Sequence, residues 1–552
     1  MKRRDFLATT ALPLLACDQP EAISGSFVGV NLDRGHLLQS GKTWPTPGST
    51  HVTGVLIVGA GVAGLAAART LRLKGVEDFA LLELEDEAGG NSRGGQTGGM
   101  ACPLGAHYLP LPGDDAPEVQ DLLEELGLRR RVAGRWVYDE RHLCHSPQER
   151  LFFNGSWQAG LLPMQDVAAA TLVQYHQFAR LVARLQRQAR WTIPASKQPL
   201  ALMQQALAAI TFDVCLNQQG FTDQHLRWYL DYCCRDDYGA GLATVSAWAG
   251  IHYFASRHGF AAPGQDVPER DGVLTWPQGN AWLTGHLAAP LGARLQTGRV
   301  VLRIAQVKHG VELDAFNLAT QATERWQARR AIIALPIFVA ARVLENPPDR
   351  LRAAAASTVY APWLVANLHL KSALHDRPGA PPSWDNVLYG DAQNAPGLGY
   401  VDASHQRLQS VPGATVLTYY RALGDVVAPI GSPPLAPGVA GRRLLLARPW
   451  SAWRDAILAE LSLPHPDLAA KVSRIDITRY GHAMAVPVPK NNGQIGLQPL
   501  YSKRRQLSKT DQPGSLSERL AVAHSDWAGY SVFEEAFTLG HAAALNMARR
   551  GI

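Results

Sequence analysis

Three glycines near the start of the chain have the spacing needed to bind the phosphates of a dinucleotide. Gly59, Gly61 and Gly64 fill the G-x-G-x-x-G pattern within VLIVGAGVAGLAAA. The first glycine permits a tight turn, the second lets the backbone approach a diphosphate, and the third lets a helix pack closely on a strand. Backbone N–H groups of that helix's first turn, which includes Ala63, then face the phosphates. Glu83 lies about twenty residues further on, where a carboxylate binds ribose hydroxyls and disfavours the 2′-phosphate of NADP.

These residues require a strand, a turn and a helix in succession. The β-branched run VLIV predicts a buried strand, the alanine-rich stretch after it predicts a helix, and FALLEL predicts the second strand, which carries the ribose carboxylate. The glycine pattern is weak by itself and gains weight from its place between a strand and a helix. An unrelated Rossmann protein that binds NAD is the alternative.

The residues after the ribose carboxylate narrow the kind of cofactor. LLELEDEAGGNS resembles the flavin-containing amine oxidase superfamily, which includes monoamine oxidases and carotenoid (phytoene) desaturases. In that superfamily a Gly-Gly-Arg segment wraps the FAD pyrophosphate. Gly89 and Gly90 match the segment, Asn91 stands in place of the arginine, and Ser92 follows it. The resemblance implies that these residues bind FAD, and Arg93 is either the substitute positive charge or a surface arginine.

Three more distant stretches extend the resemblance. PLGAHYLP at 103–110 resembles the loop beneath the flavin. WPQGNAWLTGHLAAPLGARLQTGRVVLRI is similar to the glycine turn, helix and adenine-flanking strand, with Val301 where the backbone meets the adenine. VAHSDWAGYSVFEEAFTLGHAAALNM resembles the last segment of the family. There Asp526 matches the acidic residue that meets the ribityl chain, Val532 precedes the helix that faces the isoalloxazine, and Gly540 matches the helix glycine.

Flavin amine oxidation needs a dry pocket, often an aromatic cage, in which a neutral amine presents its α C–H to the flavin. The resemblance places Trp527 and Tyr530 near the flavin as candidate catalytic pocket residues, and His482 is a third candidate. Core packing of the two aromatic residues and a structural role for the histidine are the alternatives. DYCCRDDYGA holds three aspartates that could meet a cationic polyamine, although charges on a helix surface explain them better: Asp231, Asp236 and Asp237.

One departure from the family concerns the electron acceptor. VYAPWLVANLHLK resembles a strand on which many amine oxidases carry a lysine that helps oxygen react with reduced flavin. The lysine position falls near Leu364 or Val365, and Lys371 stands only at the end of the stretch. Fast oxidase chemistry is therefore in doubt, and a quinone or a redox protein is considered as acceptor beside oxygen.

The first twenty residues have the features of an export signal in the right order. Residues 2–4 are basic, residues 6–16 form a short apolar stretch, and Cys17 follows at once. RRDFL resembles the twin-arginine motif, and LLAC resembles a bacterial lipobox. We expect a periplasmic enzyme that is exported folded with FAD already inserted, and that is lipid-anchored at Cys17 to the inner membrane. A disordered basic tail is the alternative.

Composition excludes several other classes. The chain has 552 residues with a net charge of +6, but its 53 basic residues are scattered and nearly balanced by 47 acidic ones, so no nucleic-acid partner is expected. Beyond the N-terminal segment no run of about eighteen apolar residues predicts a membrane-spanning helix. No zinc motif occurs, so no metal is expected. Folding before export predicts no disulfide among the remaining cysteines: Cys102, Cys144, Cys215, Cys233 and Cys234.

The predicted fold class is α/β, with a Rossmann-like FAD-binding domain interleaved with a mixed α+β substrate domain. After the signal at 1–17, the FAD-binding parts are 50–115, 273–344 and 481–552, and the substrate parts are 116–272, mostly helical, and 345–480. The leading functional hypothesis is an exported FAD-dependent oxidoreductase that takes hydride from the carbon next to nitrogen of an amine. The alternatives are a carbon–carbon desaturase or isomerase of an apolar substrate and a non-catalytic flavin-binding subunit.

Overall fold

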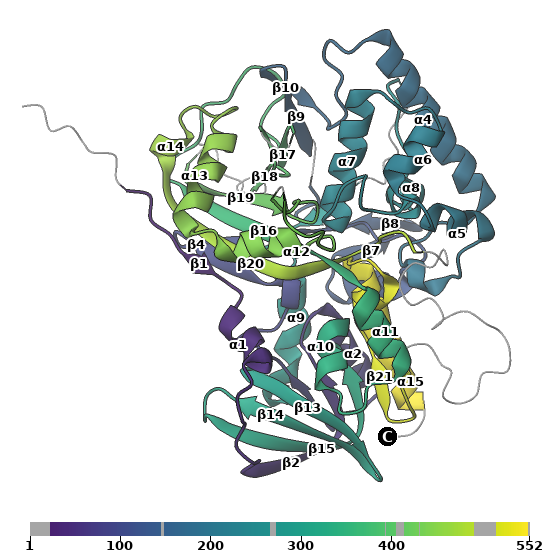
Figure 1. Cartoon of the computed structure of the whole chain (residues 1–552), viewed down its shortest axis with the longest axis vertical. Helices are drawn as coiled ribbons and strands as arrows, with labels where there is room; N and C mark the ends of the chain where they lie inside the picture. Colours follow the sequence, from purple (N-terminus) through teal and green to yellow (C-terminus); the bar gives the residue numbers. More distant parts are fainter. Residues whose placement is uncertain are drawn as a thin grey trace, which may run out of the picture.

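The computed structural model describes residues 22–144, 148–264, 272–391, 394–403, 413–429, 431–490 and 515–549. Cys17 and the predicted export signal lie outside these residues. Two large sheets organise the molecule, one in the lower part of Figure 1 and one in the upper part. The chain passes between them several times, and the result is the α/β fold that the sequence predicts.

The first sheet holds the glycine turn. Its path is β12 (Leu295–Gln296), β3 (Phe79–Leu82), β2 (Ser49–Val58), β15 (Ala322–Ile333), β14 (Gly310–Asn317) and β13 (Arg299–Val307), and β21 (Leu520–Val522) pairs with the end of β15. The strands β12, β3, β2 and β15 are parallel, and β14 and β13 extend the sheet in antiparallel fashion. The VLIV end of β2 has no accessible surface because packed side chains cover both faces.

Helices cover the first sheet. On one face lie α2 (Val62–Leu73), α3 (Pro117–Glu125), α9 (Ala281–Ala288) and α15 (Phe533–Arg549). On the other face lie α10 (Ile337–Val343) and α11 (Asp349–Ser357). The helices α2 and α15 approach so closely that a Cβ atom at Gly540 would lie 2.0 Å from the Ala63 carbonyl oxygen.

The second sheet is built from strands that are far apart in sequence. Its order is β1 (Phe27–Val28), β20 (Val472–Val486), β16 (Val359–Leu370), β19 (Thr415–Ala422), β18 (Tyr400–Asp402), β17 (Asp385–Leu388), β9 (Glu149–Phe153) and β10 (Ser156–Ala159). One face packs on a helical block, seen at the upper right of Figure 1: α4 (Ala169–Gln188), α5 (Leu202–Ala208), α6 (Phe212–Gln218), α7 (Gln224–Tyr238) and α8 (Ala247–Ala255). The other face packs on α12 (Val439–Ala447), α13 (Trp450–Leu461) and α14 (Leu468–Lys471).

Local signals in the sequence set the ends of the block helices. The Asp223 side chain accepts hydrogen bonds from the first backbone N–H groups of α7, and Ser246 caps α8 in the same way. Gly239 ends α7 in a left-handed conformation with φ of 75°. Smaller elements are the helix α1 (Leu32–His36) and three strand pairs: β4 (Gly94–Thr97) with β5 (Met100–Pro103), β6 (Tyr108–Pro110) with β11 (Val273–Thr275), and β7 (Arg129–Val132) with β8 (Arg135–Tyr138).

Two stretches bear on how the chain divides between the two parts. The helix α3 packs in the core of the first sheet, because its apolar face meets the face formed by α2 and α15. Residues 117–125 therefore pack with the first sheet, and the expected boundary at 116 stays a prediction. In addition, the stretch before 50 belongs to the fold, since β1 pairs in parallel with β20.

Three global observations complete the description. Cys102, Cys144, Cys215, Cys233 and Cys234 are free, buried thiols. Within the described ranges, no helix is both long and apolar enough to cross a membrane. The same ranges contain no group of histidine, cysteine and carboxylate side chains arranged to hold a metal ion.

The close approach of α15 to α2 gives a test of the packing. Gly540→Ala should lower the free energy of unfolding by about 1–3 kcal/mol, because the new methyl group meets backbone rather than a flexible side chain. Gly285→Ala is the control, since a Cβ atom there meets nothing within 4 Å. It should stabilise α9 by up to about 1 kcal/mol. Urea denaturation measures both, and equal stability of Gly540→Ala and wild type would contradict the packing argument.

Candidate functional site

The turn between β2 and α2 has the geometry that its glycines require. Gly59 has φ of 96°, and a Cβ atom there would lie 2.5 Å from the carbonyl oxygen of Ala334. A Cβ atom at Gly64 would lie 1.8 Å from the Gly59 carbonyl oxygen. At Gly61 the nearest atom would be 3.9 Å away, and no side chain caps the N-terminus of α2. The turn is closed on the protein side and leaves the positive end of α2, with Ala63 in its first turn, available to an anion.

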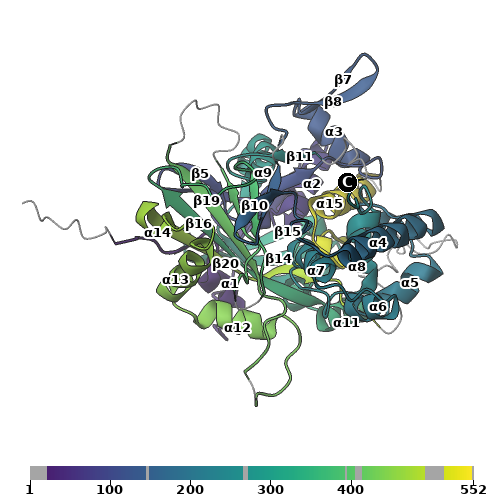
Figure 2. The ribbon, with the colours of Figure 1, turned by 90° about the horizontal axis from the view of Figure 1, so that it is seen from above.

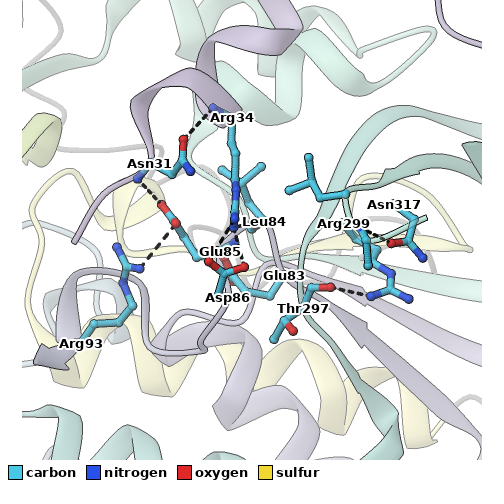
Figure 3. Close-up of polar contacts among 12 residues, drawn as sticks. Asn31, Arg34, Glu83, Leu84, Glu85, Asp86, Arg93, Thr297, Arg299 and Asn317 are labelled. Carbon is cyan, nitrogen blue, oxygen red and sulfur yellow. Dashed lines mark hydrogen bonds and ion pairs between the residues drawn. The ribbon is translucent and has the colours of Figure 1, made fainter. Parts of the chain in front are cut away.

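Glu83 follows β3 and lies beside this turn. Its Oε2 accepts the N–H of Ala60 at 2.7 Å, and its Oε1 accepts the N–H of Glu85 at 3.0 Å. Burial raises the pKa of the Glu83 carboxyl, and these two N–H groups oppose that shift. Each carboxylate oxygen keeps a further lone pair for a ribose hydroxyl. The N–H of Arg299 donates to the Glu83 carbonyl at 2.8 Å, so β13, which carries Val301, starts beside Glu83 (Figure 3).

The segment from Gly89 to Arg93 folds against the same turn. The Gly89 N–H donates to the Ala60 carbonyl at 2.8 Å, and a Cβ atom at Gly90 would lie 3.1 Å from the Gly61 Cα. The Asn91 side chain donates to the carbonyl of Ala483 at 2.6 Å. It thus ties this segment to β20. Ser92 is buried, and its carbonyl accepts the hydroxyl of Thr284 of α9 at 2.9 Å.

Arg93 is a buried member of this segment and not a surface arginine. It is 8% exposed, its Nε donates to the Gly90 carbonyl at 3.2 Å, and its Nη1 lies 3.6 Å from Oε2 of Glu85 (Figure 3). It therefore brings a positive charge next to the glycine segment that lacks the family's arginine. Direct contact of Arg93 with a phosphate stays a prediction.

Part of the site comes from the N-terminal stretch before β2. The N–H of Asn31 donates to Oε1 of Glu85 at 3.0 Å. The Arg34 guanidinium forms a two-pronged ion pair with Asp86, at 2.8 and 3.0 Å, and also donates to the Leu84 carbonyl at 3.4 Å (Figure 3). This hydrogen bonding lowers the pKa of Asp86. We call Asn31 and Arg34 the clasp, because they hold the acidic loop next to the ribose carboxylate.

The C-terminal segment holds two predicted cofactor residues, Asp526 and Val532, whose contacts are with the protein. Asp526 is buried, and its Oδ2 accepts the Tyr360 hydroxyl at 2.6 Å and the Ile337 N–H at 3.1 Å, while Oδ1 lies 3.1 Å from the His524 ring. Burial favours a higher pKa, but the His524 charge and these hydrogen bonds hold the Asp526 pKa below its ordinary value. Val532 lies just before α15 and is partly buried. Contacts of Asp526 and Val532 with the flavin stay predictions.

Two of the three predicted catalytic residues are buried in packed cores, and the third is exposed. Trp527 is 4% exposed and packs in the core between the first sheet, α10 and α11. Tyr530 has no accessible surface, and its hydroxyl accepts the Ala195 N–H at 3.3 Å inside the core of the helical block. His482 is exposed on β20 and packs on Phe338 with ring centroids 4.5 Å apart. These contacts are those of the structural alternatives, and a role of the three residues in the substrate pocket stays a prediction.

A different set of aromatic rings lies beside the segment from Gly89 to Arg93. The rings of His107 and Tyr420 stack at 4.3 Å, and Trp384 lies 5.4 Å from His107 and 5.7 Å from Tyr108. The Tyr420 hydroxyl donates to the Gly105 carbonyl at 3.2 Å. Burial lowers the pKa of His107 to about 3, so its ring is neutral. We call His107, Tyr108, Trp384 and Tyr420 the aromatic group.

Backbone hydrogen bonds connect the aromatic group to the predicted cofactor segment. The N–H of Ala106, directly before His107, donates to the Asn91 carbonyl at 2.8 Å. The Ala106 carbonyl in turn accepts the N–H of Asn280, at the start of α9, at 3.0 Å. The loop that PLGAHYLP forms thus lies directly beside the glycine segment, as its resemblance to the loop beneath the flavin implies.

Carboxyl side chains accompany the aromatic group. Glu149 and Asp385 are direct neighbours on the parallel strands β9 and β17, so their side chains leave the same face of the sheet about 5 Å apart. Asp236 comes from α7, and its charge and that of Asp385 act on both Tyr108 and Tyr420. We call Glu149, Asp236 and Asp385 the three carboxyls. They are partly accessible and lie on the side of the sheet that faces the helical block.

The three carboxyls have strongly shifted proton affinities. Burial raises the pKa of Glu149 to about 7. Burial, and then the neighbouring charge of Asp237, raises the pKa of Asp236 to about 7. Burial and the charges of Asp236 and Glu149 raise the pKa of Asp385 well above its ordinary value. Perturbed carboxyls of this kind are typical of functional sites.

The aspartates of DYCCRDDYGA therefore have separate surroundings. Asp231 pairs with Arg235 one turn along α7 and is partly exposed. Asp237 is 7% exposed and pairs with Arg257 at 3.0 Å. Only Asp236 joins the group near the flavin loop. The expectation of surface charges thus fits Asp231 and is wrong for Asp237, because α7 turns this side toward the sheet.

Alternate side chains of β16 face the helical block, where the aromatic group and the three carboxyls lie. Trp363 and Val365 point to the core shared with the helical block, whereas Leu364 points to the core beneath α13. Val365 is 2% exposed and apolar. Residues 359–370 of this strand contain no lysine, and Lys371 follows its end. The lysine expected of many amine oxidases is therefore absent from β16.

Comparison with known proteins agrees with this architecture. The family described as flavin containing amine oxidoreductase matches residues 62–544. The chain belongs to this family. Coproporphyrinogen III oxidase of Mycobacterium leprae is 28% identical over 320 residues, which cover 56% of this chain and 66% of the relative. L-amino acid dehydrogenase of Synechocystis is 27% identical over 302 residues, which cover 53% of this chain and 58% of the relative. The matched stretch thus spans less than two thirds of each relative.

A solved structure supports the fold over a larger share of the chain. Putrescine oxidase with bound putrescine has a TM-score of 0.64 and 16% identity, and the match covers 91% of this chain and all of the other. At this identity the likeness concerns the fold.

The protein is an oxidoreductase, and its cofactor is FAD. The residues present fit that cofactor. The glycine turn leaves the N-terminus of α2 without a side-chain cap, Glu83 keeps lone pairs for ribose, and Arg93 brings positive charge to the diphosphate segment.

The clasp gives a test of cofactor retention. Arg34→Ala should release FAD about threefold faster, because the loop beside Glu83 loses its ion pair, which is partly exposed and therefore of modest strength. Adding Asn31→Pro, which removes the N–H donor to Glu85, should speed release further. Flavin fluorescence after dilution measures the rate.

Arg294→Ala is the matched control for the clasp. Arg294 pairs with Glu77 just before the opposite end of β3, away from Glu83. Its loss removes the same kind of ion pair from the same sheet and should leave FAD release unchanged. Equal release rates in the clasp variants and this control would show that the clasp does not hold the cofactor loop.

Proposed function

We propose that this enzyme oxidises a cationic amine at the carbon next to nitrogen. The observation that carries the proposal is the position of the three carboxyls against the aromatic group, next to the loop that touches the cofactor segment. FAD, when bound, supplies the acceptor for the hydride of that carbon. The aromatic rings provide an apolar surround and attract a cation over their faces, and the carboxyls attract the same charge.

The chain's own residues prepare the amine by proton transfer. An ammonium group cannot give up a hydride from its neighbouring carbon readily, so its proton must leave first. A carboxylate whose pKa is about 7, such as Asp236 or Glu149, accepts that proton near neutral pH. The neutral amine is then oxidised to an imine with loss of two electrons, and water hydrolyses the imine. The neutral ring of His107 leaves the positive charge of the substrate unopposed.

The alternative of an apolar desaturase or isomerase substrate fits this arrangement less well. Three carboxyls facing a hydrocarbon would have no cationic partner, and taking a charge out of water without one costs free energy. A cationic amine supplies the partner. The names of an L-amino acid dehydrogenase and a putrescine oxidase among the relatives and neighbours also support an amine, and Arg257 is tied to Asp237 rather than free for a carboxylate.

The proposal includes an electron acceptor and a location. The absence of lysine from β16 supports a quinone or a redox protein in place of oxygen. The N-terminal residues resemble a twin-arginine signal followed by a lipobox, which supports export with FAD in place and attachment to the inner membrane through Cys17. An enzyme held there would work close to the membrane quinones.

The pKa of the carboxyls gives a pH test. Below about pH 7 Asp236 and Glu149 are protonated and neutral, so they neither attract an ammonium group nor take its proton. The kcat/KM for amines should therefore rise from pH 6 to pH 8. Asp236→Asn should lower kcat/KM at pH 8 by about 100-fold, the lower end of general-base contributions, and flatten the rise.

Stability gives a second readout for the same variant. The raised pKa of Asp236 means that the folded state holds its proton more tightly than the unfolded state, so this group lowers stability as pH rises from 4 toward 7. Asp236→Asn should gain more in melting temperature over wild type at pH 8 than at pH 5. Asp231→Asn, on the same helix but paired with Arg235, should change neither profile. An unchanged pH profile in Asp236→Asn would sink the role of this carboxyl.

The acceptor is tested separately from the substrate. The FAD of the purified enzyme is reduced with light and a photosensitiser and then mixed with a soluble quinone or with oxygenated buffer. Absorbance should return faster with the quinone, because β16 presents Val365 rather than a lysine on this side of the sheet. Rapid peroxide formation at the rate of reoxidation would instead identify an oxidase.

A further inference from the structure

An exposed hairpin stands apart from both sheets. The strands β7 and β8 pair only with each other, and Figure 2 shows them projecting beyond α3 at the edge of the molecule. Every residue from 130 to 137 is exposed. Residues 130–137 thus contribute little to either core.

The hairpin combines large apolar side chains with arginines. Val132 and Trp136 are each 45% exposed, and Val137 is 37% exposed. The register places Arg131 opposite Trp136 and Arg130 opposite Val137, so each face of the hairpin carries both kinds of side chain. Apolar and basic side chains therefore alternate on each face, and the hairpin has no separate apolar face.

The arginines of this hairpin carry a net positive charge. Arg129, at its base, pairs with Glu124 at 3.1 Å and lies over the Trp136 ring at 3.8 Å. Across the described ranges, no carboxylate forms an ion pair with Arg130, Arg131 or Arg135. Three cations therefore surround the exposed apolar side chains.

This mixture matches the boundary between lipid and water. Tryptophan and valine enter the outer part of a bilayer, where tryptophan is especially favoured, and arginine binds anionic headgroups at the same depth. A nucleic acid or an acidic protein would use the arginines but would leave Val132 and Val137 without a purpose. The apolar side chains at the projecting end therefore favour lipid.

We propose that the β7–β8 hairpin is a docking surface for a bilayer that contains anionic lipids. The hairpin contacts the membrane directly, independently of any acyl chain at Cys17 and of the nature of the substrate. Trp136 and Val132 insert among the headgroups, and Arg130, Arg131 and Arg135 pair with lipid phosphates. Docking of this kind would hold one side of the enzyme against the membrane.

The experiment uses the full chain loaded with FAD, with Cys17→Ser in every variant so that no acyl chain contributes. Sedimentation with vesicles of phosphatidylcholine plus phosphatidylglycerol should carry the protein down, whereas pure phosphatidylcholine vesicles should carry much less. Reversing three charges together, with Arg130→Glu, Arg131→Glu and Arg135→Glu, should weaken binding at least about tenfold. Added salt should also weaken binding of the unreversed chain.

The matched control reverses three arginines elsewhere. Arg180, Arg184 and Arg187 are exposed on α4, and their reversal changes the net charge by the same amount. This control should bind anionic vesicles like the parent. Equal FAD content and melting temperature show that the hairpin variant remains folded. If both triple variants lose binding equally, net charge rather than the hairpin is responsible, and the proposal is overturned.

A second measurement reports contact by the hairpin itself. Brominated lipids quench tryptophan fluorescence on contact, and Trp136→Phe should remove most of that quenching while the protein still binds. Quenching that is unchanged in Trp136→Phe would overturn the proposal. A second result would also overturn it. If the parent does not bind vesicles but binds an acidic redox protein, and the charge-reversed variant loses that binding, the surface belongs to a protein partner.

Discussion

Backbone contact around the glycine turn is the constraint on which the other parts of this structure depend. A diphosphate can be held by backbone N–H groups only if no side chain stands between them and the ligand. The turn meets this condition because Gly61 carries no side chain and has open space beside it, whereas Gly64 closes the protein side of the turn against the Gly59 carbonyl oxygen. A Cβ atom at Gly540 would lie 2.0 Å from the Ala63 carbonyl oxygen, and one at Gly90 would lie 3.1 Å from the Gly61 Cα. Three segments from opposite ends of the chain are therefore held at backbone contact around one turn.

The same constraint makes the charge of the neighbouring loop important. Leu84–Glu87 carries three carboxylates beside a site for a diphosphate, and like charges there would repel the ligand. Arg93 and Arg34 offset two of them, and Arg34 comes from the stretch before the first large strand. That stretch also pairs with β20 of the second sheet. The residues just after the predicted export signal thus connect both sheets and complete the cofactor site.

The sequence was informative where chemistry depends on neighbours along the chain. The glycine turn, the ribose carboxylate Glu83 and the following glycine segment all lie within one unit of strand, turn and helix, and the structure places them together. The sequence is less informative where orientation depends on a turn. Trp527 and Tyr530 are three residues apart, but Gly529, with φ of 87°, turns the chain between them, and the two side chains enter different cores. No pattern of residue types reports that turn.

The three carboxyls lie beyond the reach of sequence for a related reason. Glu149 and Asp385 become neighbours only through the parallel register of β9 and β17, and Asp236 reaches them from a helix. The sequence features that belong to this site are HY in PLGAHYLP and the aspartates of DYCCRDDYGA. Neither feature indicates which residues of other segments lie next to it.

Partial burial of these carboxyls costs stability that packing must offset, since each would be ionised at neutral pH if it were in water. A fold can reduce this cost with arginines, as it does for Asp237 with Arg257. No described ion pair joins a basic side chain to Glu149, Asp236 or Asp385. A cationic substrate would therefore find negative charge without a cationic partner beside aromatic rings, and its binding would recover part of the free energy that the fold gives up to keep these groups partly buried.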